Sequence, residues 1–322
     1  MAYTGSGTTV QIGKETTWGT AVDGAKILSY TSETLKSAAD RKIEESLIAS
    51  TAPSGLDIMG IKVEGDVSGI LKPEFAGYLI KLAFGGDDTV TQNSPVTGAH
   101  THSIPLVSAS DSLPSATIIV DRKGAVRKYT GCKVSTFKLD GAAGDYVKFT
   151  ASFKGKDEST GSLADLSALA LQSFKTVGAT ITLGGTSYDA KSVSYSLDNS
   201  IEDVGQTYGS GLYVNEPIHG QRKATIEVGV DYISGIETLI DTNLLTDTKI
   251  ASIVWTLKSP SVVTGSTQYT VTLTLNNVVL TEVTRNVSGT GIIGAKISGQ
   301  ALSISSTEPV GASIIDATSS AY

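Results

Sequence analysis

Cysteine, methionine and tryptophan are scarce in this 322-residue sequence, which holds one, two and two of them respectively. The single cysteine, Cys132, excludes an intrachain disulfide and any cluster of thiolate metal ligands. No apolar run approaches the roughly eighteen residues of a membrane-spanning helix. The first residues, Met-Ala-Tyr-Thr-Gly-Ser, have neither the basic nor the apolar region of a secretory signal. We therefore expect a protein without a membrane segment that stays in the cytoplasm where it is made, or leaves it by lysis.

Charged residues are also few. They make up 18% of the chain, below the usual level of about a quarter, and the net charge of −7 gives an isoelectric point of about 5.1. Proteins that seek phosphate backbones are typically basic, so nucleic-acid binding is not expected. His100 and His102 form an H-x-H pair that could ligate a metal together with carboxylates. A loop before a strand is the better interpretation of this pair, and no metal site is predicted.

No catalytic constellation stands out, and we predict that the protein is not an enzyme and needs no cofactor. Residues 289–294 read GTGIIG, the spacing of a dinucleotide-binding loop, but an alternating strand follows where such a loop needs a helix. Cys132 has no catalytic context and is expected to be buried in a strand. Adjacent acids such as Asp157 and Glu158 cannot pair as glycosidase carboxylates, because neighbours on one strand point apart.

Glycine, by contrast, is abundant, with 34 residues, and polar and apolar residues alternate in many stretches, for example 60–71 and 224–230. This period of two is typical of half-buried strands, so the fold class is predicted to be mainly β. Two helices interrupt the strands. One begins at Pro73 and ends before Gly85; the other begins near Tyr232 and has apolar residues at helical spacing. A shorter helical patch is expected near residues 163–171.

The order of these elements occurs twice along the chain. Each helix follows a long alternating strand, at 61–70 and at 224–233, and each strand follows a polar stretch of hairpin character. We interpret this pattern as one module used twice. The predicted boundaries are residues 1–172 for an N-terminal arm with the first module, and 173–322 for the second. A two-domain β protein with unrelated halves is the alternative.

Several short motifs, taken in their order along the chain, resemble the major tail tube proteins of long-tailed phages. They are GKETTWGTA at residues 13–21, SETLK at 32–36 with Arg41 and Ile43 after it, and SLDNSI at 196–201. The resemblance extends from about residue 8 to about residue 300.

This resemblance implies both a fold and an assembly. Proteins of this family fold as a small β-barrel or sandwich with a flanking helix, form rings whose inner sheets join, and stack into a tube through hairpins and N-terminal arms. DNA passes through the bore without specific binding, and tape measure, tail terminator and tail tip proteins are the other partners. Three two-module chains would complete a ring of pseudo-sixfold symmetry, and a ring of six chains is the alternative. The protein is thus expected in the virion tail, after assembly in the host cytoplasm.

In a barrel wall, one side of each alternating strand faces the bore. The candidates for that lining are acids of the two repeated strands, in which Glu64 and Glu227 fall in register: Glu64, Asp66, Glu227 and Asp231. An acidic wall makes no phosphate contacts, whereas roughly six to ten basic contacts already give an affinity for DNA that salt changes by about 10³ to 10⁵. An ordinary solvated strand face is the alternative.

Two polar segments, 38–55 and 201–220, are long for simple turns and are predicted to reach a neighbouring copy as hairpins. Mobile surface loops are the alternative. Trp18 is predicted to be a buried anchor in the adjoining subunit, or else to cover its own core. The predicted inter-subunit residues are Trp18, Ile43, Leu47, Ile48, Tyr208, Leu212 and Tyr213.

Other classes of protein fit the sequence less well. Tube proteins of contractile or phage-derived injection machines usually have a single module. An exported β-repeat adhesin or pilin-like protein needs an export signal. A carbohydrate-binding sandwich or glycosidase is expected to expose more aromatic side chains than Trp18 and Trp255 can supply.

Overall fold

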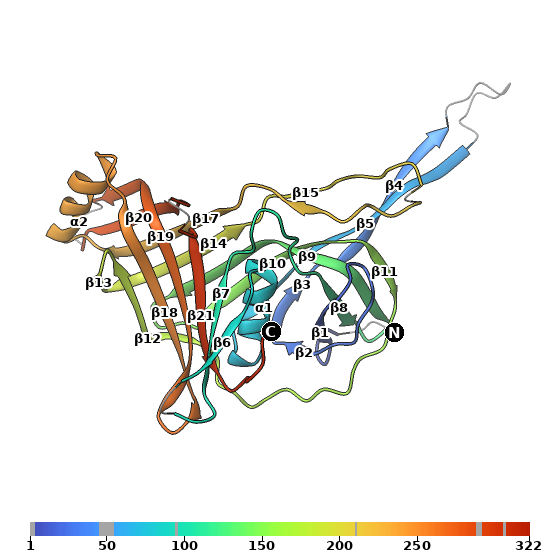
Figure 1. The fold of residues 1–322 in the computed structure, drawn as a ribbon, viewed down its shortest axis with the longest axis horizontal. Coiled ribbons are helices and arrows are strands. Elements are labelled where there is room, and N and C mark those ends of the chain that lie inside the picture. The colour runs from blue at the N-terminus through green and yellow to red at the C-terminus, as the bar shows by residue number, and fades with distance from the viewer. Residues whose placement is uncertain (1–3, 45–54, 94–95, 210, 288–291, 305–306) are drawn as a thin grey trace.

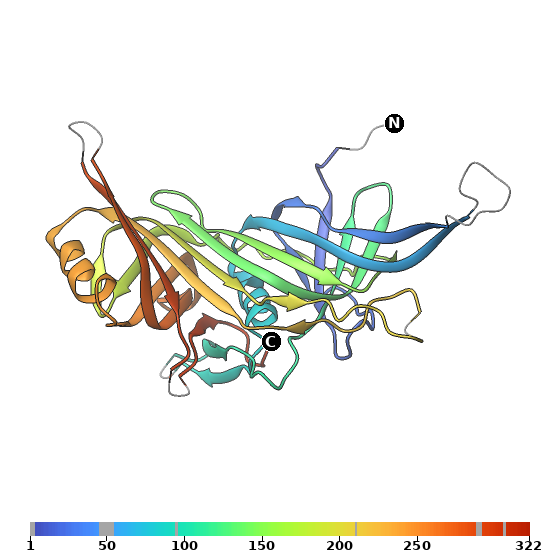
Figure 2. The ribbon, with the colours of Figure 1, turned by 90° about the horizontal axis from the view of Figure 1, so that it is seen from above.

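The protein is an elongated, mainly β molecule, as the sequence predicts (Figures 1 and 2). The computed structural model describes residues 4–44, 55–93, 96–209, 211–287, 292–304 and 307–322. Within these ranges two α-helices and one π-helical turn accompany the strands. No helix of the described residues is long and apolar enough to span a membrane.

The elements of the first half are β1 (Thr9–Lys14), β2 (Lys26–Leu28), β3 (Tyr30–Glu33), β4 (Lys36–Glu44), β5 (Gly55–Ile70), α1 (Pro73–Phe84), β6 (Thr89–Gln92), β7 (His100–Pro105), β8 (Ala116–Asp121), β9 (Val126–Ala142), β10 (Lys148–Gly155) and β11 (Asp157–Thr160). Those of the second half are β12 (Lys175–Leu183), β13 (Thr186–Tyr188), β14 (Ala190–Asp198), β15 (Ile201–Glu202), β16 (Ile218–His219), β17 (Lys223–Asp231), α2 (Ser234–Leu239), the π-helical turn η1 (Ile240–Leu244), β18 (Ile250–Thr264), β19 (Thr267–Asn286), β20 (Gly294–Ala301) and β21 (Val310–Asp316).

Both predicted helices form. α1 begins at Pro73, where a missing N–H leaves no hydrogen bond unmade, and it ends at Gly85, whose φ of +80° suits glycine. Every residue of α1 except Glu74 is buried. The shorter α2 begins at Ser234, two residues after the predicted start, and continues into η1.

The helical patch expected near residues 163–171 is wrong, because this segment has no regular secondary structure. The side chain of Gln11 bonds both backbone groups of Ala164, accepting from its N–H at 2.9 Å and donating to its carbonyl at 2.8 Å. Leu169 remains 54% exposed. The segment therefore lacks both the backbone bonds and the buried face that would favour a helix.

In the first half, β9 is long enough to belong to two sheets. Its first part lies between β8 and β11 in a sheet completed by β1 and β2. Its second part pairs with β10, β10 pairs with β5, and β3 and β4 form the edge beyond β5. Buried residues of both sheets and of α1 belong to one core. The strands of the described residues form open sheets rather than a closed barrel.

The second half repeats this order of pairing. β18 pairs with β12 on one side and β19 on the other, and β12 pairs with β13. The second part of β19 pairs with β20, β20 with β17, and β17 with β14. Each of these pairings has its counterpart in the first half. In their order across the sheets, β13, β12, β18, β19, β20, β17 and β14 correspond to β2, β1, β8, β9, β10, β5 and the edge formed by β3 and β4.

A β-bulge marks the same place in both halves. In β9 the extra residue is Ser135, whose hydroxyl donates to the carbonyl of Ser152 at 3.1 Å. In β19 the extra residue is Thr281, whose hydroxyl donates to the carbonyl of Ser298 at 3.2 Å. Bulges are local features with a defined position in a ladder. Their match, hydrogen bond included, favours the predicted duplication of one module.

The division at residues 172 and 173 stays a prediction, and two sheets cross it. β9 pairs with β14 over the seven residues from 192 to 198. β7 of the first half pairs with β21, so the β6–β7 hairpin extends a sheet of the second half. The chain also returns to α1 at its last residue, where Tyr322 lies against Gly77. The two halves therefore share one hydrophobic core.

Candidate functional site

One sheet runs through both halves, and we call it the central sheet. Its order is β3 with β4, then β5, β10, the second part of β9, β14, β17, β20 and the second part of β19. Buried and more exposed residues alternate along its strands, most regularly in β10 and β17. The buried side chains join the core, and the opposite side of the sheet is named here the polar face.

All four acids predicted to line a bore lie on the polar face. Glu64 and Asp66 stand on β5 and Glu227 and Asp231 on β17, and the valines next to them on these strands are buried in the core: Val63, Val67, Val228 and Val230. The central sheet thus brings together acids that are more than 160 positions apart in the sequence. The register expected between Glu64 and Glu227 is wrong, because Glu227 lies seven residues before α2 and it is Asp66 that lies seven residues before α1. That the four acids line a bore stays a prediction.

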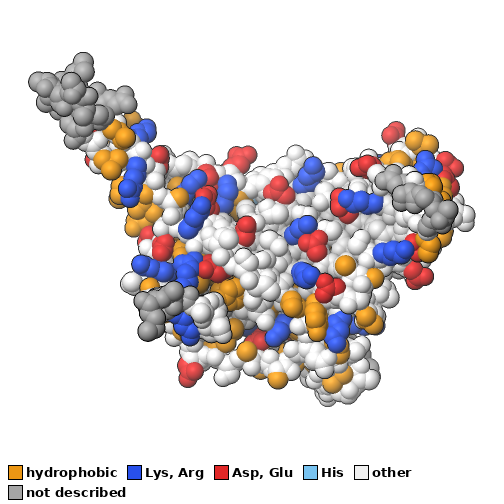
Figure 3. Space-filling view, turned by 180° about the vertical axis from the view of Figure 1, so that it is seen from behind, with side chains coloured by type: hydrophobic (Ala, Val, Ile, Leu, Met, Phe, Trp, Pro, Cys, Tyr) orange, Lys and Arg blue, Asp and Glu red, His pale blue; other side chains and the backbone are white. Residues whose placement is uncertain are grey.

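The polar face is nevertheless not acidic, which corrects the expectation of an acidic wall. Three of the four acids contact a lysine of the adjacent strand. The pairs are Lys36–Glu64 at 3.8 Å, Lys296–Glu227 at 2.8 Å, and Lys191 with Asp231. Seen from behind, basic and acidic side chains are interspersed among uncharged ones across the middle of the molecule (Figure 3). The face is therefore close to charge balance, and serine and threonine fill much of the rest.

The central sheet has an edge at each end. One is the outer edge of β3 and β4. The other is the outer edge of β19 over residues 279–286, whose counterpart in β9 pairs with β14. No strand in the described part of the chain pairs with either edge. Open strand edges are sites at which another chain can pair.

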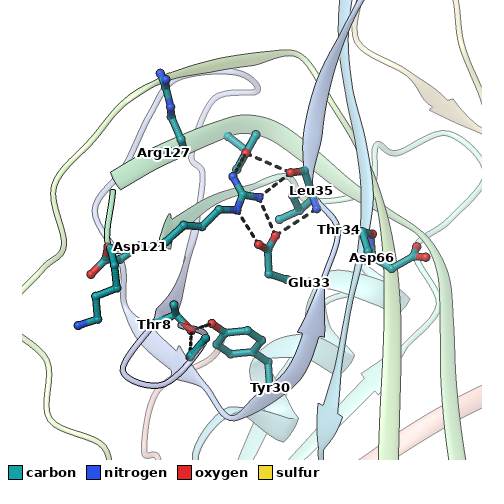
Figure 4. Close-up of polar contacts among 12 residues, drawn as sticks. Thr8, Tyr30, Glu33, Thr34, Leu35, Asp66, Asp121 and Arg127 are labelled. Atoms are coloured by element: carbon teal, nitrogen blue, oxygen red, sulfur yellow. Dashed lines mark hydrogen bonds and ion pairs between the residues drawn. The ribbon is translucent and has the colours of Figure 1, made fainter. Parts of the chain in front are cut away.

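Side chains of the same chain cap the first of these edges (Figure 4). The guanidinium of Arg122 donates from Nε and Nη2 to the two carboxylate oxygens of Glu33, at 2.7 and 2.8 Å, and from Nη2 to the carbonyl of Leu35 at 2.7 Å. The hydroxyl of Tyr129 donates to the same carbonyl at 3.1 Å. The hydrogen bond to Glu33 is the largest cause of a raised pKa of Arg122. The arginine therefore holds β3 and the start of β4 in place.

A second carboxylate completes this cap. The N–H of Ser37 donates to Glu158 at 3.2 Å, and Arg127 lies 3.5 Å from the same side chain. Sequence reasoning missed the cap, although Glu33 lies in the SETLK motif. Arg122 is 89 residues away from Glu33, and bonds to backbone carbonyls leave no sequence pattern.

β4 and the first part of β5 form a hairpin that projects from one end of the molecule (Figures 1 and 2). Four of its large apolar residues are exposed: Ile43 by 60%, Leu56 by 58%, Ile58 by 41% and Met59 by 42%. Leu47 and Ile48, which the sequence also placed at an inter-subunit contact, lie outside the described residues. Exposed aliphatic residues grouped on a projecting element indicate a contact surface.

The second predicted hairpin, 201–220, lies beside the first in the same chain. It contains the short ladder β15–β16, and the N–H of Ile61 in β5 donates to the carbonyl of Leu212 at 2.7 Å. Tyr208 is fully exposed, Leu212 is 44% exposed and Tyr213 is half-buried. The sequence predicts two separate reaching segments, and the structure brings them together. Their contact with a neighbouring copy stays a prediction.

Trp18 lies against its own chain. Its indole N–H donates to the carbonyl of Gly131 at 3.1 Å, and the ammonium of Lys156 is 4.9 Å from the ring. Just before it, β1 pairs on both sides, with β2 and β8. The opening stretch is therefore part of the first half rather than a free arm, which favours the alternative that Trp18 covers its own core. An additional contact with a neighbour stays a prediction.

Glu15, in the same motif, was not singled out by the sequence. It is 6% exposed, and its carboxylate accepts hydrogen bonds from four groups. The donors are the hydroxyls of Ser115 at 2.7 Å and Thr117 at 2.8 Å, and the N–H groups of Gly19 at 2.8 Å and Gly131 at 2.9 Å. A buried carboxylate with this many donors stabilises the loop that carries Trp18.

His102 belongs to a buried charged cluster, although the sequence placed it in a loop. It lies in strand β7, with its Nδ1 2.8 Å from Asp88 and its Nε2 3.2 Å from Asp316 and 2.9 Å from the carbonyl of Thr318. Burial alone lowers the pKa of His102, but the hydrogen bonds and charges of Asp316 and Asp88 outweigh it and raise that pKa to about 9. A protonated histidine thus ties the C-terminal segment to the first half. No sequence pattern indicates this cluster, since the two aspartates lie 14 and 214 positions away from His102.

Comparison with known proteins adds one finding. A family model described as phage tail tube protein matches residues 5–314, which is nearly the whole chain. No curated protein matches the sequence. The matched range includes both edges of the central sheet, the projecting hairpin and the polar face.

Proposed function

We propose, from the premise that this chain belongs to the phage tail tube protein family, that its copies join edge to edge into rings and that stacked rings form the tail tube. As a member of that family, the protein is a structural component of the virion tail. DNA passes through the bore of the tube on its way into the host. The observation that carries this proposal is the repeated central sheet with one open edge at each end.

The internal junction between β9 and β14 supplies a template for the contact between copies. In it, Lys138 lies opposite Ser196. Thr284 stands three residues after the bulge of β19, as Lys138 does after the bulge of β9. Lys36 pairs with β5 nine residues before the first helix, as Ser196 pairs with β17 nine residues before the second. Thr284 of one copy therefore lies opposite Lys36 of the next, and the sheet continues from copy to copy.

This contact is head to tail, so it closes into a ring only at a fixed number of copies. Since each chain supplies two repeats, three chains give six equivalent positions around the ring. Six chains, the alternative, would give twelve. We favour three chains, because the junction inside a chain and the junction between chains then have the same geometry.

The cap on the first edge fits a subunit that is stored as a monomer before assembly. Arg122 and Glu158 occupy the Leu35 carbonyl and the Ser37 N–H, which belong to the stretch that the template pairs with β19. Occupied backbone groups cannot pair with a passing strand, and this protects free subunits from disordered association. Ring formation then exchanges these side-chain bonds for backbone bonds of the neighbour.

The polar face lines the bore in this arrangement. Glu64, Asp66, Glu227 and Asp231 face the DNA together with the lysines that pair with three of them, and the balanced charge neither binds phosphates cumulatively nor repels them strongly. The duplex can therefore slide.

The remaining partners follow from the family alone. A tape measure protein occupies the bore before ejection, terminator and tip proteins meet the two ends of the tube, and assembly takes place in the host cytoplasm. The adhesin and the carbohydrate-binding alternatives have no comparable support.

Cross-linking tests the proposed junction. With Lys36→Cys and Thr284→Cys in one chain, oxidation of assembled protein should join neighbouring copies, because directly opposed residues of antiparallel strands have Cβ atoms about 5 Å apart. A denaturing gel should then show dimers and a closed trimer as the largest species, and electron micrographs of the same sample should show rings or tubes.

The matched control pairs Thr284→Cys with Lys42→Cys, which lies about 20 Å farther along the hairpin strand and should not cross-link. Cross-linking of the control pair, in rings whose Lys36 and Thr284 positions stay unlinked, contradicts the register. A closed hexamer contradicts three-chain stoichiometry, and persistent monomers under all conditions contradict the assembly.

A further inference from the structure

The projecting hairpin has two chemically different faces. Ile43 lies opposite Leu56, and Arg41 lies opposite Ile58, in the ladder of β4 and β5. Because side chains alternate between faces, these four share one side of the hairpin. The other side carries the pairs Lys42–Asp57 and Glu44–Gly55. The first side, named here the apolar hairpin face, is exposed to solvent in the single chain.

The second half contains a shorter version of this hairpin in the same register. β15 and β16 pair Ile201 with His219 and Glu202 with Ile218. These two pairs lie as far along their strands from the Ser196–Thr225 pair as Arg41–Ile58 and Lys42–Asp57 lie from the Lys36–Glu64 pair in the first half. The face of Ile201 and His219 in the second half therefore corresponds to the apolar hairpin face in the first.

In the second half that face is covered. Ile201 is only 7% exposed and packs with Val107 and Leu113, which lie in the segment before β8. His219 is half-buried, and burial is the largest cause of its lowered pKa. The opposite face, with Glu202 and Ile218, is exposed. The short ladder thus docks on the first half through the side that the projecting hairpin leaves bare.

Polar contacts hold the short ladder in this position. Lys133, only 1% exposed, places its ammonium 2.7 Å from the carboxylate of Glu216, 2.6 Å from the hydroxyl of Ser112 and 2.9 Å from the carbonyl of Pro217. The guanidinium of Arg222 reaches the carbonyl of Phe84 at the end of α1. The contact between the halves is therefore extensive and ordered, rather than a chance proximity.

The surface that corresponds to Val107 and Leu113 lies at the opposite end of the molecule. β18 is the counterpart of β8, so the segment before it, residues 245–249, takes the place of the segment before β8. Leu245 in this segment is 72% exposed. In Figures 1 and 2 the hairpin projects from one end of the molecule, and α2, which precedes this segment, lies at the other. The exposed apolar hairpin face at one end and the exposed Leu245 at the other suit head-to-tail contact between copies.

We infer that the apolar hairpin face of one copy, with Ile43, Leu56 and Ile58, packs on Leu245 and residues 245–249 of the next copy in the same ring. The partner is a second copy of this chain, and the inference rests on the proposed ring. It assigns the hairpin a lateral contact within a ring, beside the junction of the central sheets. The resemblance to tail tube proteins implies instead that hairpins join stacked rings along the tube.

Serine substitution on the apolar hairpin face tests this contact. Ile43→Ser with Leu56→Ser should leave the monomer folded, because both residues are exposed, and should lower the yield of rings at fixed protein concentration by about tenfold or more, the loss expected when aliphatic side chains no longer become buried. Sedimentation velocity gives the yield. The matched control changes the other face, Lys42→Ser with Asp57→Ser, and should alter it less than about twofold.

A second measurement locates the partner surface. Ile58→Cys and Leu245→Cys, in separate chains that are mixed before assembly, should become linked by a short thiol-reactive cross-linker. The native Cys132 does not interfere, since it is buried and burial raises the pKa of its thiol. Each single variant assembled alone should give no linked dimer.

The outcomes separate this contact from the proposed ring. If Lys36→Cys and Thr284→Cys cross-link while Ile58→Cys and Leu245→Cys do not, the ring stands and the lateral contact is wrong. If the serine variant gives normal single rings that fail to stack, the hairpin contacts the next ring instead, which also overturns the inference. If neither pair cross-links, the ring itself is wrong and the lateral contact falls with it.

Discussion

Tubes of a Glu64→Lys, Glu227→Lys double variant should assemble normally yet deliver DNA poorly, with infectivity reduced by about a hundredfold or more. Each substitution changes the charge of the polar face by two units, and loss of Glu227 also leaves Lys296 without its partner at 2.8 Å. Every ring then presents several unpaired cations to the duplex. Because roughly six to ten phosphate contacts already change affinity by about 10³ to 10⁵ with salt, repetition along a tube should hold the DNA in place.

Folding should not change much in this variant, since exposed ion pairs contribute only about 0 to 1 kcal/mol each. The measurements are tube formation in electron micrographs, retention of duplex DNA by purified tubes at two salt concentrations, and the titre of phage carrying the variant. As a control, Lys36→Gln with Lys296→Gln removes cations from the same face and should leave the titre near its normal level. Normal titres for the double lysine variant, together with normal tubes, mean that these acids do not face the bore.

The repeated architecture was predictable because it rests on local patterns. A long alternating strand followed by a helix occurs in both halves, with Pro73 marking the start of the first helix and helical apolar spacing marking the second. The structure has the mainly β fold that these patterns indicate. The bulges at Ser135 and Thr281 were not predictable, because a bulge adds one residue without changing the local composition. Yet these two residues give the most exact correspondence between the halves.

Contacts between distant residues account for most of what the sequence missed. The partners Arg122 and Glu33 are far apart in sequence, and nothing in either neighbourhood indicates the other. The charge balance of the polar face was missed for a related reason. Glu227 lies on β17 and its partner Lys296 on β20, and no local pattern in the sequence indicates that these two strands are neighbours.

His102→Gln should lower the free energy of unfolding by about 3 kcal/mol at pH 6, which makes it the largest effect on stability expected here. His102 has a pKa of about 9 in the folded protein, against about 6.5 in an unfolded chain. The difference of about 2.5 units corresponds to about 3 kcal/mol of stability when the histidine is protonated. Glutamine keeps a hydrogen bond but supplies no charge, so Asp88 and Asp316 are left buried without a cation.

The sign of the pH dependence follows from the raised pKa. Below about pH 6.5 the histidine is protonated in both states and its full contribution is present; as the pH rises through about 9 the folded state loses its proton and the contribution disappears. Urea unfolding of the natural protein should therefore show stability falling between these pH values, and the gap to His102→Gln should close in the same window. His100→Gln, two residues away on β7 and only half-buried, is the control and should change stability by less than about 0.5 kcal/mol. A gap that stays constant from pH 6 to pH 9.5 means that His102 acts through packing with Tyr322, whose ring lies 4.6 Å away, and not through its charge.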